Sequence, residues 1–179
     1  MEYAGAAELE AGLDEIRRSP ADKGTVELIV RRPAEDEREV LEEGTLSLDE
    51  GLVGDAWRPR ALAHGEPDSR VQLTVMNARA AALIAGDSER RPLAGDQLYV
   101  DLDLSHRNLP PGTLLALGSA VIEVSEPPHT GCAKFTARFG SDATRFVNSP
   151  AGRELHLRGI NARVVEPGTV RRGDTIRKL

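Results

Sequence analysis

Turn-forming sequences recur at short intervals along this chain and leave little room for long helices or strands. Gly-Asp pairs begin at Gly54, Gly86, Gly95 and Gly173, and Pro-Gly-Thr begins at Pro111 and Pro167. Glycine and aspartate favour tight turns, and proline cannot donate a ladder hydrogen bond. Each Pro-Gly-Thr precedes an apolar run, as in hairpins of one sheet system. The chain is therefore expected to be mostly β with short helices, an α+β domain with a barrel-like core.

The segments between these turns have the patterns of short elements. We expect strands at residues 25–31, 70–75, 98–102, 113–117, 120–124, 161–166 and 174–179. We expect helices at residues 6–17, 78–85, 132–139 and 143–148, and another from residue 150. Gly118-Ser119 is a two-residue connection that predicts a tight hairpin, and Asn77 and Ser149 are predicted helix caps. Residues 57–69 have no periodicity and are expected to form a polar loop.

The single cysteine, Cys132, lies between an expected strand and an expected helix. Pro127 and Pro128 should end the strand, and Thr130 should cap the helix. Phe135 and Phe139 are four residues apart and should share one helix face.

This placement favours a reactive thiolate at Cys132. A thiol in the first helical turn meets unpaired backbone N–H groups and the positive end of the helix dipole. Lys134 and His129 add positive charge nearby, and the thiolate is both the nucleophile and the metal ligand. The alternative is that Cys132 is a small buried hydrophobic residue, as a lone cysteine often is.

Charge is distributed unevenly around the cysteine. Residues 34–55 are rich in Asp and Glu, and Arg38 is their only basic residue. Residues 127–165 instead contain six basic and two acidic residues. The region near Cys132 thus suits an anionic ligand such as a phosphate. The net charge of −6 argues against a nucleic-acid partner.

Several other classes are also disfavoured. No run of about 18 apolar residues is present, so no membrane span is expected, and one cysteine is consistent with a cytoplasmic protein. The four histidines are scattered and do not form a zinc-binding pattern. Pyridoxal phosphate is not expected, because Lys23 and Lys178 lie in a linker and at the terminus and only Lys134 remains.

Several motifs, taken in order, resemble one family. They are Leu52-Val-Gly-Asp55, His64-Gly65, Arg70–Thr74, Ala94–Leu98, Leu109–Gly118, Val121–Gly140 around the cysteine, Arg158–Gly168 and Arg172-Gly-Asp174. Together they resemble the MOSC domain, named after the C-terminal part of molybdenum-cofactor sulfurases. The resemblance implies a β-barrel core, strands rather than a helix in residues 35–57, a peripheral helix and linker at residues 1–24, and a MOSC-like domain at residues 25–179.

The resemblance also implies a site. In MOSC proteins the cysteine matching Cys132 either carries a persulfide sulfur or binds molybdenum held by a pterin. The residues implied to contact this molybdenum cofactor are Thr74, Asp96, Gln97, His129, Thr130, Lys134 and Arg138. Many family members with metal-bound reductase activity have Gly-Glu-Asn or Arg-Pro-Asn where this chain has Gly95-Asp96-Gln97, so this turn itself supplies no arginine.

Three functions follow as alternatives. The first is a stand-alone MOSC protein that uses Cys132 with the molybdenum cofactor, either for sulfur transfer or for reduction of N-hydroxylated compounds. It implies an anionic pterin or small-molecule ligand and a partner protein that donates sulfur or electrons. The second is a non-catalytic MOSC-fold binding module, and the third is a cofactor-free redox-sensing cysteine protein.

Overall fold

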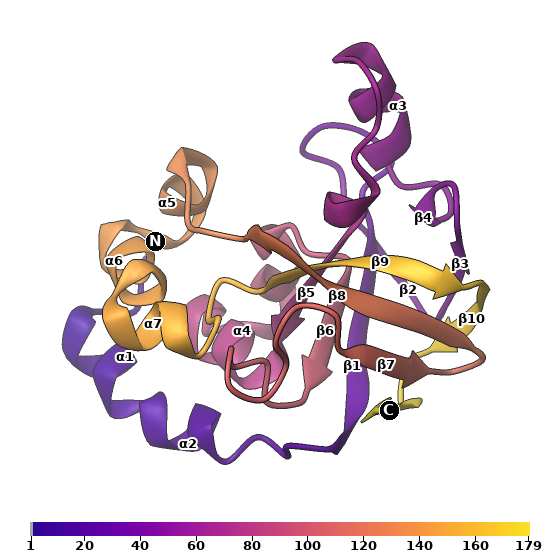
Figure 1. The fold of residues 1–179 in the computed structure, drawn as a ribbon. Coiled ribbons are helices and arrows are strands. Elements are labelled where there is room, and N and C mark those ends of the chain that lie inside the picture. The colour runs from indigo at the N-terminus through magenta and orange to yellow at the C-terminus, as the bar shows by residue number, and fades with distance from the viewer. Residues whose placement is uncertain (1) are drawn as a thin grey trace.

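A closed seven-stranded β-barrel forms the centre of the structure, a computed structural model that describes residues 2–179 (Figure 1). Its strands are β1 (Lys23–Arg31), β5 (Leu73–Asn77), β6 (Leu98–Asp101), β7 (Leu114–Leu117), β8 (Ala120–Pro128), β9 (Ile160–Glu166) and β11 (Thr175–Lys178). Their order is β11-β7-β8-β9-β5-β6-β1, and β1 pairs again with β11 to close the barrel. The neighbours are antiparallel except β5 and β6. The expected mostly β, barrel-like fold is confirmed.

The predicted hairpin joins β7 and β8. Leu117 pairs with Ala120 across the two-residue turn, where Gly118 has φ +56°. A Cβ at Gly118 would lie 2.1 Å from the carbonyl oxygen of Thr169, so glycine is required for both its backbone angle and its lack of a side chain.

The acidic segment after β1 forms strands, as the family resemblance implied. β2 (Glu39–Leu41) extends the barrel sheet beside β1. β3 (Glu43–Ser47) and β4 (Gly51–Leu52) form a second, small sheet with β10 (Gly168–Arg171). The sequence pattern gave no separate prediction for β10.

Two expectations were wrong in this half of the chain. The predicted polar loop contains helix α3 (Trp57–Ala63), which buries none of its residues and stands away from the barrel (Figure 1). It has no apolar stripe to reveal it; Asp55 Oδ2 accepts from the Trp57 N–H at its start. The expected strand at residues 70–75 instead begins at Leu73, after a single 3-10 turn at Ser69–Val71.

The helices cover one side of the barrel with a second apolar core. α1 (Ala6–Ala11) and α2 (Leu13–Arg17) replace the single expected helix, and they are separated at Gly12. Their buried residues Leu9, Leu13 and Ile16 belong to the same cluster as residues of α4 (Ala78–Ala85) and α6 (Ser141–Asn148). A distinct cluster of Leu, Val and Ile side chains fills the barrel.

The remaining helices agree closely with the sequence. Asn77 Oδ1 accepts from the Ala80 N–H at the start of α4, and Ser149 Oγ accepts from the Gly152 N–H at the start of α7 (Pro150–Glu154). The strand β8 was expected to end near Val124, but it continues to Pro128. Its ladder with β9 is interrupted before Pro128 pairs with Ile160, and the Pro127 carbonyl accepts from Asn161 Nδ2, so neither proline has to donate. Among residues 2–179, no helix has the length and apolar character to cross a membrane.

The N-terminal helices are predicted to contribute to stability. Leu9 is completely buried, so Leu9→Ala should lower the free energy of unfolding by about 2–5 kcal/mol. Urea denaturation would measure the change. The exposed neighbour Glu10 provides the control, since Glu10→Ala should change stability by less than about 0.5 kcal/mol. Equal, small effects of both substitutions would mean that α1 does not depend on its apolar contact with the domain.

Candidate functional site at Cys132

Cys132 is exposed and occupies the N-cap position of α5 (Ala133–Phe139). The prediction that Thr130 caps this helix was wrong, because the helix begins two residues later than Thr130 would require. The alternative of a buried structural cysteine also disagrees with the exposed thiol. Phe135 and Phe139 do share one buried face, with ring centroids 5.1 Å apart.

The thiol lines a small hollow of ≈ 150 Å³. Its walls come from the loop after β1, from α3, from the Ala94-Gly95 turn, from α5, and from Arg158 just before β9. Helices α3 and α5 both lie above the strands in Figure 1, and each contributes lining residues to this hollow. Segments distant in sequence therefore meet at the cysteine.

The surroundings lower the pKa of Cys132 below its ordinary value. Partial burial acts in the opposite direction and is the largest single influence. It is outweighed by hydrogen bonds from the backbone N–H groups of Phe135 and Lys134, followed by the positive charges of Arg158 and Arg138. The thiolate predicted from the helix position is thus supported by specific groups.

Cationic side chains dominate the wall of the hollow. They are Arg32, Arg38, Arg60, Lys134, Arg138 and Arg158. Burial, and then the charges of Arg138 and Arg32, lower the pKa of Arg38. Arg38 donates only to the carbonyls of Pro92 and Glu37, and neither Arg38 nor Arg60 has a carboxylate partner among residues 2–179. The crowding of positive charge favours an anionic ligand.

A buried ion pair lies beneath this wall. Arg158 Nη1 donates to Asp96 Oδ2 at 2.6 Å, and its Nη2 donates to the Ala94 carbonyl at 2.8 Å. The Arg158 guanidinium also lies 4.9 Å from the centre of the Phe135 ring, on the helix that carries Cys132. Arg158 therefore connects the turn before β6 to the cysteine helix.

His129 lies on the other side of Asp96. Its Nδ1 is 3.5 Å from Asp96 Oδ1, and both atoms are buried without a hydrogen-bond partner. Burial lowers the pKa of His129 to about 4, although Asp96 acts to raise it, so the ring is neutral at pH 7. His129 thus adds no positive charge near the thiol, contrary to the prediction. Gly159 permits this packing, because a Cβ there would lie 3.2 Å from His129 Nδ1 and 2.6 Å from the Val75 carbonyl oxygen.

The acidic and basic regions of the sequence meet across the opening. Lys134 Nζ donates to Glu35 Oε1 at 2.9 Å, and Arg138 Nη2 donates to Asp36 Oδ1 at 3.1 Å. Glu35, Asp36 and Lys134 are largely exposed, so these contacts are weak in water. They show that the loop after β1 lies over the cysteine helix.

Half of the sequence-predicted site lies at the hollow. Cys132, His129, Lys134 and Arg138 line it, and Asp96 supports it from below through Arg158. Thr74 and Gln97 lie apart from its wall, where Thr74 Oγ1 donates to Gln97 Oε1 at 2.6 Å. Thr130 is exposed just before Cys132. Contact of these residues with a cofactor stays a prediction.

Four arginines of the hollow were missed as site residues: Arg32, Arg38, Arg60 and Arg158. The turn at Gly95–Gln97 does lack an arginine of its own, but two arginines reach it. Arg158 binds Asp96, and Arg32 Nη1 donates to the Gly95 carbonyl while pairing with Asp55. Two weak signals were available: Arg32 directly follows a predicted strand, and Arg158 lies in the basic region at residues 127–165.

The comparisons with known proteins decide the family. The sequence-family model of the MOSC domain matches residues 54–177, which is more than half of the chain. The chain belongs to the MOSC family. No curated protein has significant sequence similarity to it.

Solved structures show the same MOSC fold. YuaD from Bacillus subtilis has a TM-score of 0.60 and 17% identity, over 86% of this chain and 94% of that chain. YiiM from Escherichia coli has a TM-score of 0.57 and 19% identity, over 87% of this chain and 69% of that one. YiiM from Geobacillus stearothermophilus has a TM-score of 0.54 and 12% identity, over 87% and 73%. At these identities the likeness shows a shared fold.

The pKa of the Cys132 thiol is predicted to be lower than that of a free cysteine, which is about 8.5. The rate of alkylation by iodoacetamide, followed by mass spectrometry, should reach half its maximum at a lower pH. Arg138→Gln should move this midpoint upward, because losing a nearby positive charge destabilises the thiolate. Arg145→Gln is the matched control, since Arg145 is an exposed residue of α6 outside the hollow. A wild-type midpoint at or above the free-cysteine value would contradict this account.

Proposed function

We propose that this MOSC-family chain binds a molybdenum cofactor in the hollow and that Cys132 acts on it. Cys132 would be either a molybdenum ligand during reduction of N-hydroxylated compounds or a persulfide carrier in sulfur transfer. The observation that carries the proposal is an exposed, acidified thiol in a hollow whose arginines outnumber their carboxylate partners. This part of the function goes beyond membership of the family.

The residues present fit such a group. A thiolate is a suitable ligand for a soft metal centre. Arg38 and Arg60 have guanidinium groups without carboxylate partners among the described residues, and a pterin phosphate could accept hydrogen bonds from both. Arg138 and Lys134 could join them by exchanging their weak contacts with Asp36 and Glu35. The predicted residues Thr74, Gln97 and Thr130 do not line the hollow. They would then support the backbone around the cofactor instead of contacting it from this wall.

The chain's own residues would position the cysteine helix and keep the Cys132 thiol ionised. When bound, the molybdenum would supply the two-electron redox chemistry of the reduction. Arg158 would keep α5 in place through Asp96 and Phe135, and the backbone N–H groups of Phe135 and Lys134 would keep Cys132 ionised for ligation. Reduction would also require a partner protein that donates electrons.

Sulfur transfer is a second candidate because Cys132 is exposed at the surface. A donor protein's persulfide must reach Sγ directly for this reaction. The Cys132 thiolate would attack the terminal sulfur of the donor persulfide, forming a new S–S bond to Sγ and releasing the donor's thiolate. A small anionic ligand other than the pterin, a binding module without catalysis, and a redox sensor remain the competing functions.

Elemental analysis for molybdenum, together with pterin fluorescence, tests the proposal on protein purified from a host that makes the cofactor. Wild type should retain metal and pterin, and Cys132→Ser should lose the metal if Cys132 is a ligand. Arg38→Gln should weaken pterin retention at least about tenfold, because a charge-assisted hydrogen bond to phosphate is lost.

Arg145→Gln is again the control and should retain both components. Wild-type protein without metal or pterin, but with one added sulfur atom on Cys132 by mass spectrometry, would favour the persulfide carrier. Absence of metal, pterin and persulfide would overturn the proposal. Peroxide-reversible modification of Cys132 in that protein would then indicate a redox sensor.

A further inference from the structure

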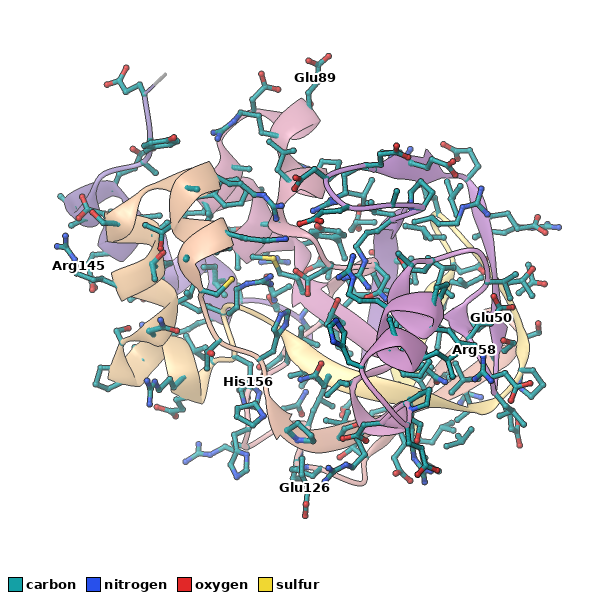
Figure 2. All side chains as sticks on the ribbon, turned by 90° about the horizontal axis from the view of Figure 1, so that it is seen from above. Glu50, Arg58, Glu89, Glu126, Arg145 and His156 are labelled. Carbon is teal, nitrogen blue, oxygen red and sulfur yellow. The ribbon has the colours of Figure 1, made fainter. Side chains whose placement is uncertain are left out.

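A second cavity, of ≈ 340 Å³, lies next to the cysteine hollow. His129 lines both spaces, so the two spaces adjoin at this residue. The second cavity is bounded by the end of β8, the loop before β7 and the connection from α7 to β9. Figure 2 places His156 and Glu126, two of its lining residues, on the same side of the molecule. Its size is within the usual range of small-molecule sites, about 300–1,000 Å³.

The two spaces differ sharply in charge. Six Arg and Lys side chains line the hollow, whereas no Arg or Lys lines the second cavity. Among the described residues, Glu126 is the only acidic one that lines it, and its apolar lining residues are a leucine, a valine, an isoleucine and three prolines. Because a carboxylate at an apolar surface repels anions, this cavity disfavours the ligands that the hollow attracts.

Two polar side chains of the second cavity, His156 and Asn161, present hydrogen-bond acceptors. His156 Nδ1 lies 2.7 Å from the Leu104 carbonyl oxygen, which can only accept, so Nδ1 carries the proton. In the neutral ring, Nε2 is then an acceptor. Asn161 Nδ2 donates to the Pro127 carbonyl, which leaves Asn161 Oδ1 as an acceptor. A ligand that matches these groups would present N–H or O–H donors.

The protein holds the His156 ring in a defined direction. The residue has φ +51°, in the left-handed region that side-chain-bearing residues adopt at a cost in free energy. The ring also packs edge-on against His106, with centroids 6.0 Å apart. The carbonyl of Leu104 and the ring of His106 thus fix the imidazole that lines the cavity.

We propose that this cavity binds an uncharged small molecule bearing N–H or O–H donors, and that this molecule is the body of the substrate. Because the cavity and the hollow adjoin at His129, the ligand's reactive end would lie at this residue, on the side of Cys132. Identification of the ligand as a substrate rests on the proposed function. Binding itself does not, because no cavity residue except His129 lines the hollow.

Cofactor-free Cys132→Ser protein provides the test, with ligands followed by amide chemical shifts in an NMR titration. Benzamide, which carries N–H donors, should bind and shift residues around His156 and Asn161. N,N-dimethylbenzamide lacks those donors and should bind about three- to tenfold more weakly. Benzoate should bind more weakly than benzamide, because it is repelled by Glu126.

Two exposed positions give matched variants. His106→Trp should fill the cavity mouth and weaken benzamide binding at least tenfold, whereas Arg107→Trp places the same side chain on an exposed neighbour outside it. Glu126→Lys should strengthen benzoate binding at least threefold, and Glu166→Lys, outside the cavity, should not.

Unchanged benzamide affinity in His106→Trp, or benzoate binding as tight as benzamide in the parent protein, would overturn the cavity proposal. If the tryptophan variant fails to fold, the Glu126→Lys comparison decides alone. These outcomes are independent of metal and pterin retention, so failure of the cavity proposal is distinguishable from failure of the proposed function. Benzamide binding in a protein that never retains the cofactor would support a ligand site and remove its link to molybdenum chemistry.

Discussion

The buried pair of Arg158 and Asp96 is the contact on which the arrangement of the site depends. Asp96 is fully buried, and Arg158 is almost as inaccessible. Such a pair is costly to form, but removing one partner leaves an uncompensated buried charge, typically at a cost of about 3–5 kcal/mol. Because Arg158 also contacts the Phe135 ring and the Ala94 carbonyl, the pair joins a turn of the barrel to the helix of Cys132. The position of the thiol therefore depends on a buried contact made by residues outside its own helix.

Much of the barrel follows directly from local sequence. The β7–β8 hairpin, the Asn77 cap and the Ser149 cap depend on neighbouring residues, and these predictions were confirmed. Helix α3 could not be predicted from periodicity, because it buries no apolar face. The continuation of β8 through Pro127 and Pro128 depends on pairing with β9, far along the chain.

The site was predictable to a similar extent. Cys132 and its immediate neighbours are contiguous in sequence, so a reactive thiol could be inferred from one stretch. Arg32, Arg38 and Arg158 reach it from other parts of the chain, and an arginine in sequence gives no indication of which space it faces. His129 shows the same limit, since the burial that keeps its ring neutral depends on the distant residues Asp96 and Gly159.

Two environments of different character adjoin at His129. The cysteine side gathers positive charge, and the other side has apolar walls with acceptors but no Arg or Lys. An anionic cofactor and an uncharged substrate could therefore bind close together without competing for the same groups. On the proposed function, Cys132 would then act between two different ligands.

Anomalous X-ray diffraction at the molybdenum absorption edge tests the central claim most directly. The measurement requires crystals of protein that carries metal by elemental analysis. The account predicts an anomalous peak inside the hollow beside Cys132 Sγ, bordered by the arginines that line it. A molybdenum peak elsewhere on the molecule would contradict binding at this site.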